Sequence, residues 1–119
     1  MRLLVTGARD YTNRRRLFKI LDEYLDQVEV LIHGGARGAD TLAGEWAVER
    51  DIPVEVYRAD WERYGRGAGP IRNRQMLDEG KPDFVIAFPK TIIQESRGTR
   101  NMVEQAISRG VEYRLIEER

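Results

Sequence analysis

The stretch VLIHGGARGAD, residues 30–40, indicates the fold of this chain more clearly than any other segment. It begins with the apolar residues of a buried strand and ends where a helical pattern starts, and three glycines lie between the two. A strand that passes through a short glycine turn into a helix is the repeating unit of parallel α/β proteins. We therefore expect further copies of this unit on either side.

Five apolar runs alternate with helix-like segments along the 119 residues. The helical segments show apolar residues at i, i+3, i+4 and i+7, and Asn13, Pro70, Thr99 and Gly110 supply start and stop signals. This alternation predicts one Rossmann-like domain over residues 1–119, an α/β fold with three layers in the order α/β/α. The expected strands are 3–6, 28–33, 54–58, 84–88 and 111–116, and the expected helices cover 17–25, 39–47, 69–77 and 102–107.

The strand order follows from the apolar pattern of each run. A central parallel strand is buried on both faces and reads as continuously apolar, whereas an edge strand often alternates. The runs at 54–58 and 111–116 alternate, so they belong at the edges. With right-handed crossovers, this predicts a five-stranded parallel sheet in the order 3-2-1-4-5. Because the winding reverses between strands 1 and 4, a ligand is expected there, at the carboxyl ends of the strands.

Composition limits the classes of protein that fit. Twenty basic and twenty acidic residues give zero net charge, and the absence of cysteine excludes disulfides and thiolate metal sites. No signal peptide pattern and no apolar stretch of about 20 residues occurs, so we expect a cytoplasmic protein without a membrane partner. Seventeen of the basic residues are arginine. This bias suits phosphate contacts, but genomic base composition explains it equally well.

The loop from Gly34 to Asp40 predicts a phosphate-binding site. Its glycines permit close approach of the backbone, and the amides at the start of the following helix favour an anion. The spacing matches neither the dinucleotide fingerprint nor a P-loop. The alternative is a tight turn without a ligand.

Two more glycine turns, which begin at Gly7 and Gly98, are expected at the same edge of the sheet. On the helix between them, Arg72, Asn73 and Met76 share one side. Polar groups on a helix that should cover the sheet indicate either a functional site or a solvated helix end.

Two further segments have open interpretations. The glycine-containing loop 60–68 places Trp61 and Tyr64 where they could stack on a base, or Trp61 could pack over the end of the sheet. His33 is the one histidine, and we interpret it as a hydrogen-bonded structural residue, with acid–base catalysis as the alternative. No spacing of His, Asp or Glu suggests a metal site, and no cofactor is expected.

Three motifs resemble the YspA-related branch of the SLOG superfamily, which includes Lonely Guy phosphoribohydrolases and DprA-type proteins. They are HGGARGAD at 33–40, AGPIRN at 68–73 and GTRNM at 98–102. The resemblance implies a Rossmann-like domain that binds nucleotides or nucleotide-derived ligands, and a homodimer or larger homo-oligomer. Some relatives cleave the N-glycosidic bond of nucleoside monophosphates.

The resemblance to the phosphoribohydrolases is incomplete at their catalytic positions. Arg72 and Met76 match their arginine motif, but Asn73 replaces a lysine and Met102 stands where a catalytic glutamate is expected. Without that carboxylate, hydrolysis needs another acid such as Glu95 or Glu104.

We therefore predict a nucleotide-binding sensor or sequestering protein, with ADP-ribose-like compounds among its possible ligands. The alternatives are a phosphoribohydrolase, with Arg72, Glu95 and Glu104 as catalytic candidates, and a DprA-like binder of single-stranded DNA, against which zero net charge argues. The predicted ligand-binding residues are Gly7, Arg9, Gly34, Gly35, Ala36, Arg37, Gly38, Asp40, Trp61, Arg72, Asn73, Gly98, Thr99 and Asn101.

Overall fold

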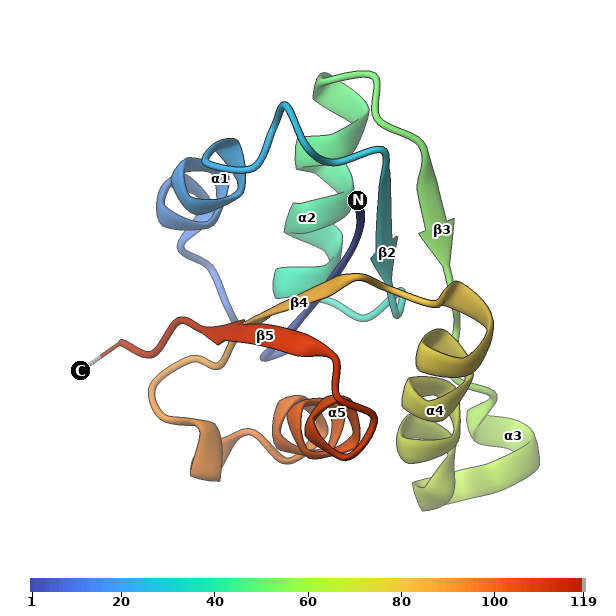
Figure 1. Ribbon diagram of the computed structural model, residues 1–119. Helices are drawn as coiled ribbons and strands as arrows, with labels where there is room; N and C mark the ends of the chain where they lie inside the picture. Colours follow the sequence, from blue (N-terminus) through green and yellow to red (C-terminus); the bar gives the residue numbers. More distant parts are fainter. Residues whose placement is uncertain (119) are drawn as a thin grey trace.

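A computed structural model describes residues 1–118 and shows a five-stranded parallel sheet between two layers of helices (Figure 1). The strand order β3-β2-β1-β4-β5 confirms the predicted order, and the two alternating runs form the edge strands. The strands are β1 (Arg2–Gly7), β2 (Val30–His33), β3 (Val54–Val56), β4 (Phe84–Phe88) and β5 (Glu112–Leu115).

The burial of the central strand β1 on both faces explains why its sequence is continuously apolar. Leu3, Leu4 and Val5 have no exposed surface. Leu3 and Val5 belong to the core cluster on one face of the sheet, and Leu4 belongs to the cluster on the other face. Because both faces of β1 are covered, alternation between polar and apolar residues is not possible there.

Two helices cover each face of the sheet (Figure 1). The helices α1 (Arg14–Asp22) and α2 (Ala39–Glu49) pack on one face, while α4 (Ala68–Gly80) and α5 (Arg97–Ser108) pack on the other. Fully buried Trp46 of α2 donates its indole N–H to Asp22 Oδ1 at 2.9 Å, which ties α2 to the end of α1. No helix among residues 1–118 is both long and apolar enough to cross a membrane.

The first helix ends three residues before its apolar pattern does. Asn13 caps it as expected, since its Oδ1 accepts from the Arg16 amide at 3.1 Å. However, α1 ends at Asp22, because the amides of Glu23 and Tyr24 bond to carbonyls three residues back and tighten the chain into turns. Tyr24 still packs on Phe84, with ring centroids 5.4 Å apart. Apolar spacing therefore continued beyond the helix itself.

Two other local predictions were wrong. Segment 60–68 is not an open loop but forms the short helix α3 (Trp61–Tyr64) and the 3-10 turn η1 (Gly65–Gly67), and Asp60 caps α3 by accepting from the Arg63 amide. Thr99 does not cap α5, because that helix starts two residues earlier, after the 3-10 turn η2 (Ile93–Glu95). Thr99 is instead buried in the first turn, where its hydroxyl accepts from Ser96 at 2.7 Å.

Candidate functional site at the carboxyl ends of the strands

The ends of β1 and β2 meet the start of α2 through two glycines. Gly38 has a φ of +75°, and a Cβ on it would lie 2.2 Å from the Ala8 carbonyl oxygen. A Cβ on Gly7 would lie 2.5 Å from the Ala39 Cβ. Neither position tolerates a side chain without movement of the backbone, so both glycines already have a reason in packing.

The predicted phosphate-binding loop is held partly by its own side chains. Asp40 Oδ2 accepts from the amides of Gly34 and Ala36 at 3.0 and 3.3 Å. The Gly35 amide donates to His33 Nδ1 at 2.9 Å. Three amides of the loop are therefore engaged, and the next two, those of residues 37 and 38, have no acceptor within the described chain.

Asp40 is a buried carboxylate at the centre of this site. Its exposed fraction is 5%. Burial raises its pKa to about 6, although the loop amides and the positive charges of Arg72 and Arg9 favour the ionised form. Its other oxygen, Oδ1, accepts no hydrogen bond from residues 1–118. Asp40 can therefore offer a free acceptor to a bound molecule.

His33 is a neutral hydrogen-bond acceptor in the folded protein. Burial lowers its pKa to about 4, with smaller contributions from the positive charges of Arg58 and Arg72. Because Nδ1 accepts from the Gly35 amide, the ring proton is assigned to Nε2. His33 is therefore hydrogen-bonded, as we expected for a structural residue.

Arg72 of α4 reaches beneath the glycine loop. Its Nη1 donates to the Gly34 carbonyl at 2.6 Å, and its Nε donates to Asn73 Oδ1 at 3.1 Å. A Cβ on Gly34 would lie 2.5 Å from the guanidinium, so glycine makes room for this contact. Burial lowers the pKa of Arg72, while Asp40 opposes this effect. Arg72 forms no ion pair with a described carboxylate, so its charge remains available to an anion.

Asn73 joins α4 to α5 in a partly buried polar cluster. Its side chain is 3% exposed, and its Nδ2 donates to Gly98 O and Asn101 Oδ1 at 3.2 and 3.1 Å. Gln105 donates to the same Asn101 oxygen at 2.8 Å. The polar side of this helix is therefore not a solvated end. The sequence analysis indicated Asn73 and Asn101 but missed Gln105. The i, i+4 spacing of Asn101 and Gln105 was the signal that could have identified Gln105 as the third residue of this cluster.

The arginines separate into two groups by their partners. Seven described arginines form ion pairs with carboxylates, namely Arg2, Arg14, Arg16, Arg50, Arg100, Arg109 and Arg114. Among residues 1–118, the arginines without such a pair are Arg9, Arg15, Arg37, Arg58, Arg63, Arg66, Arg72, Arg74 and Arg97. Except for Arg15 and Arg74, the unpaired group lies in loops or helix starts that follow β1, β2, β3 and β4. We call these seven the edge arginines.

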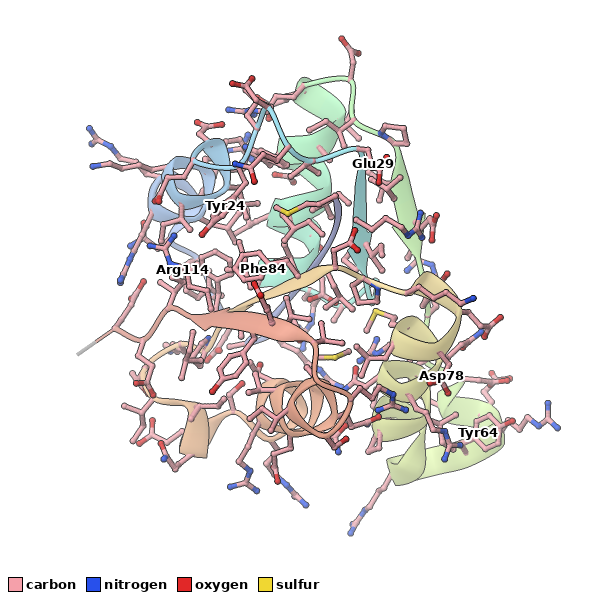
Figure 2. The ribbon with its side chains drawn as sticks, in the orientation of Figure 1. Tyr24, Glu29, Tyr64, Asp78, Phe84 and Arg114 are labelled. Atoms are coloured by element: carbon pink, nitrogen blue, oxygen red, sulfur yellow. The ribbon has the colours of Figure 1, made fainter. Side chains whose placement is uncertain are left out.

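Trp61 does not pack over the end of the sheet. It is 47% exposed, and the Arg9 guanidinium lies 5.0 Å from the centre of its ring. Tyr64 of the same short helix is 41% exposed, beside Arg63 (Figure 2). Two accessible aromatic rings therefore accompany the edge arginines.

The two glutamates proposed for catalysis, Glu95 and Glu104, have partners other than Arg72. Glu104 pairs with Arg100 at 3.5 Å in a hollow that Tyr113 of β5 also lines. Glu95 accepts a hydrogen bond from Thr91, and neither glutamate bonds to Arg72. Met102, at the position expected for glutamate, is fully buried. Within residues 1–118, no three acidic or histidine side chains gather into a metal site.

Comparisons with known proteins agree with this fold. The model of the YspA, cpYpsA-related SLOG family matches residues 1–64. Gene 61 protein of Mycobacterium phage D29 is 36% identical over 118 residues, which cover 92% of this chain and 91% of that protein. The X-ray structure of DNA processing protein A (DprA) from Streptococcus pneumoniae superposes with a TM-score of 0.78 at 19% identity. That match covers 99% of this chain but only 50% of the DprA chain.

Proposed function

Because this chain belongs to the YspA, cpYpsA-related SLOG family, we propose that it binds a nucleotide or nucleotide-derived ligand at the carboxyl ends of its strands. The observation that carries the proposal is the group of edge arginines. Among residues 1–118 these side chains have no carboxylate partner, although the whole chain has as many acidic as basic residues. Unpaired guanidinium groups at one edge of a sheet favour a ligand with phosphate groups.

The phosphate subsite is proposed between the glycine loop and Arg72. The amides of Arg37 and Gly38 have no acceptor in the described part of the chain, and they lie at the N-terminus of α2, whose dipole favours an anion. Arg72 supplies a half-buried positive charge that already contacts the loop. A charge-assisted contact of this kind contributes about 1.5 to 3 kcal/mol.

The nucleoside part of the ligand has two proposed contacts. The exposed ring of Trp61 can stack on a base, and Arg9 already lies over that ring. The free Oδ1 of Asp40 can accept a hydrogen bond from a ribose hydroxyl. These contacts would distinguish a nucleotide from inorganic phosphate.

Binding without hydrolysis is the form of the function that we propose, as a sensor or a sequestering protein. Hydrolysis of an N-glycosidic bond needs a carboxylate to stabilise the ribosyl cation or to activate water. Met102 cannot do this, and Glu104 is paired with Arg100. Release of free base from AMP, GMP, CMP or UMP at about 1 s⁻¹ would instead support the phosphoribohydrolase alternative.

Single-stranded nucleic acid is a second candidate ligand. The exposed Trp61 and Tyr64 and the edge arginines combine stacking rings with positive charge, as proteins that bind single strands do. The zero net charge of the chain argues only weakly against this candidate, because the unpaired positive charges are concentrated at one edge of the sheet. A fall in affinity for oligonucleotides over several decades between 50 and 200 mM salt would favour it over a mononucleotide.

The proposal is tested by calorimetric titration of AMP and adenosine into three proteins. Arg72→Ala should weaken AMP binding about tenfold to hundredfold and leave adenosine binding nearly unchanged. Arg15→Ala is the matched control, because Arg15 also forms no ion pair with a described carboxylate but lies on α1. Equal losses for AMP and adenosine would place the phosphate away from Arg72. No binding of any nucleotide to the wild-type protein would contradict the proposal.

A further inference from the structure

The edge strand β5 has an unpaired side. The Ile116 amide donates to Ala87 of β4 at 2.9 Å, so even-numbered residues here direct their backbone groups toward β4. Successive residues of a strand direct these groups to opposite sides. The backbone groups of Tyr113 and Leu115 therefore point away from the sheet, where they can pair with another strand.

The two faces of β5 carry different side chains, with charged residues on one face and apolar surface on the other. Arg114 points toward the turns after α1, where its Nη1 donates to Glu23 and to the Tyr24 hydroxyl at 3.1 and 3.0 Å (Figure 2). Glu112 lies on the same face because side chains alternate along a strand. Tyr113 lies on the opposite face and is 43% exposed.

The face that carries Tyr113 continues onto α5 as an exposed apolar surface. Ile107 is 54% exposed there and lines one hollow with Val103, Tyr113 and Leu115. Arg100 and Glu104, one charge of each sign, line the same hollow. This surface has no charge imbalance that would repel its own copy.

We propose that β5 pairs antiparallel with β5 of a second copy, across a twofold axis at Tyr113. The two sheets would then join into one of ten strands, and both copies would use the same surface. In this register Tyr113 faces its counterpart as a hydrogen-bonded pair, which matches the outward direction of its backbone groups. The apolar surfaces around Ile107 and Tyr113 would lie on one face of the joined sheet.

The charges of Glu112 and Arg114 favour this register over the two in which the axis is shifted by one residue. With the axis at Tyr113, Glu112 of each copy lies opposite Arg114 of the other. An axis at Glu112 or at Arg114 would instead place like charges directly opposite each other, which is destabilising. If the axis lay between two residues, each residue whose backbone groups point outward would face a residue whose backbone groups point toward its own sheet, so the strands could not pair.

Light scattering after size-exclusion chromatography tests the proposal over a range of concentrations. The wild-type chain should be a dimer, and Glu112→Arg should weaken it about tenfold or more, because both cross-strand pairs become repulsive. The exposed Glu112 has no ion pair within the described chain, so the substitution leaves the folded monomer intact. Glu79→Arg, on the exposed side of α4, is the matched control and should remain dimeric.

Mixing two variants tests the register itself. Glu112→Arg and Arg114→Glu should each dimerise about tenfold or more weakly than wild type when alone and should form a mixed dimer together, because every opposed pair then has opposite charge. Circular dichroism checks that both are folded. A wild-type monomer at all concentrations, a Glu112→Arg variant that dimerises as tightly as wild type, or a mixture that dimerises no more tightly than either variant alone would each overturn the proposal. None of these results depends on nucleotide binding, so this test is independent of the proposed function.

Discussion

The variant Asp40→Asn should make the stability of this protein fall steeply at acid pH. Burial raises the pKa of Asp40 from 3.8 to about 6, so its protonated form stabilises the fold below pH 4, and this contribution is lost as pH rises through 6. Burial lowers the pKa of His33 from 6.5 to about 4, so its contribution is present above pH 6.5 and is lost as pH falls through 4. The two effects oppose each other in the same pH range.

The magnitudes follow from the two pKa shifts. One pKa unit corresponds to about 1.4 kcal/mol, so the full shift of each group is worth about 3 kcal/mol, of which about 2 to 2.5 kcal/mol falls between pH 4 and 6.5. In the wild-type chain the two contributions nearly cancel. Asp40→Asn removes one of them, so the variant should lose about 2 kcal/mol relative to wild type as pH falls from 6.5 to 4.

Urea denaturation at several pH values between 4 and 7 measures this difference. His33→Asn is the complementary variant, because its side-chain oxygen can still accept from the Gly35 amide but does not titrate. Its stability relative to wild type should rise as pH falls, opposite to Asp40→Asn. If the Asp40→Asn difference stays flat over this range, Asp40 does not titrate as its burial implies, and the reasoning is refuted.

Three further substitutions test the site. Gly38→Ala should lower the free energy of unfolding, measured by urea denaturation, by about 1 to 3 kcal/mol because Gly38 has a positive φ. Gly98→Ala should leave the free energy of unfolding unchanged, because the space around Gly98 is open. Equal effects of the two substitutions would contradict the packing argument. Asn73→Ala should cost about 1 to 3 kcal/mol because it removes the hydrogen bonds of a buried side chain that joins α4 to α5, and a loss under about 0.5 kcal/mol would show that the cluster is not stabilising. Trp61→Ala should leave stability within about 0.5 kcal/mol but weaken nucleotide binding about fivefold to hundredfold, and unchanged affinity would exclude stacking.

The fold could be predicted because burial leaves a direct trace in the sequence. Continuous apolar runs marked β1, β2 and β4, and alternation marked the edges. Local hydrogen bonds leave a weaker trace. The turns after Asp22 keep Tyr24 in the core although α1 has ended, so helical spacing alone extended the helix too far. The capping Asp60 was a readable sign of α3, but four residues are too few for an apolar pattern.

The candidate site could be located from sequence but its internal contacts could not. Polar residues on a covering helix correctly marked Asn73 as unusual. The sequence could not show that Asp40 and His33 already bind loop amides, because these contacts depend on side-chain direction. Total charge also concealed the edge arginines, since ion pairing elsewhere in the fold decides which arginines remain free.

Amide chemical-shift mapping during titration with AMP tests the central claim most directly. If a nucleotide binds at the carboxyl ends of the strands, the amide signals of Arg9, Arg37, Gly38 and Trp61 should shift with a common affinity. The signal of Tyr113 in β5, at the far edge of the sheet, should stay in place. Shifts confined to β5, or equal shifts from adenosine and AMP at the glycine loop, would contradict a phosphate-binding site at this edge.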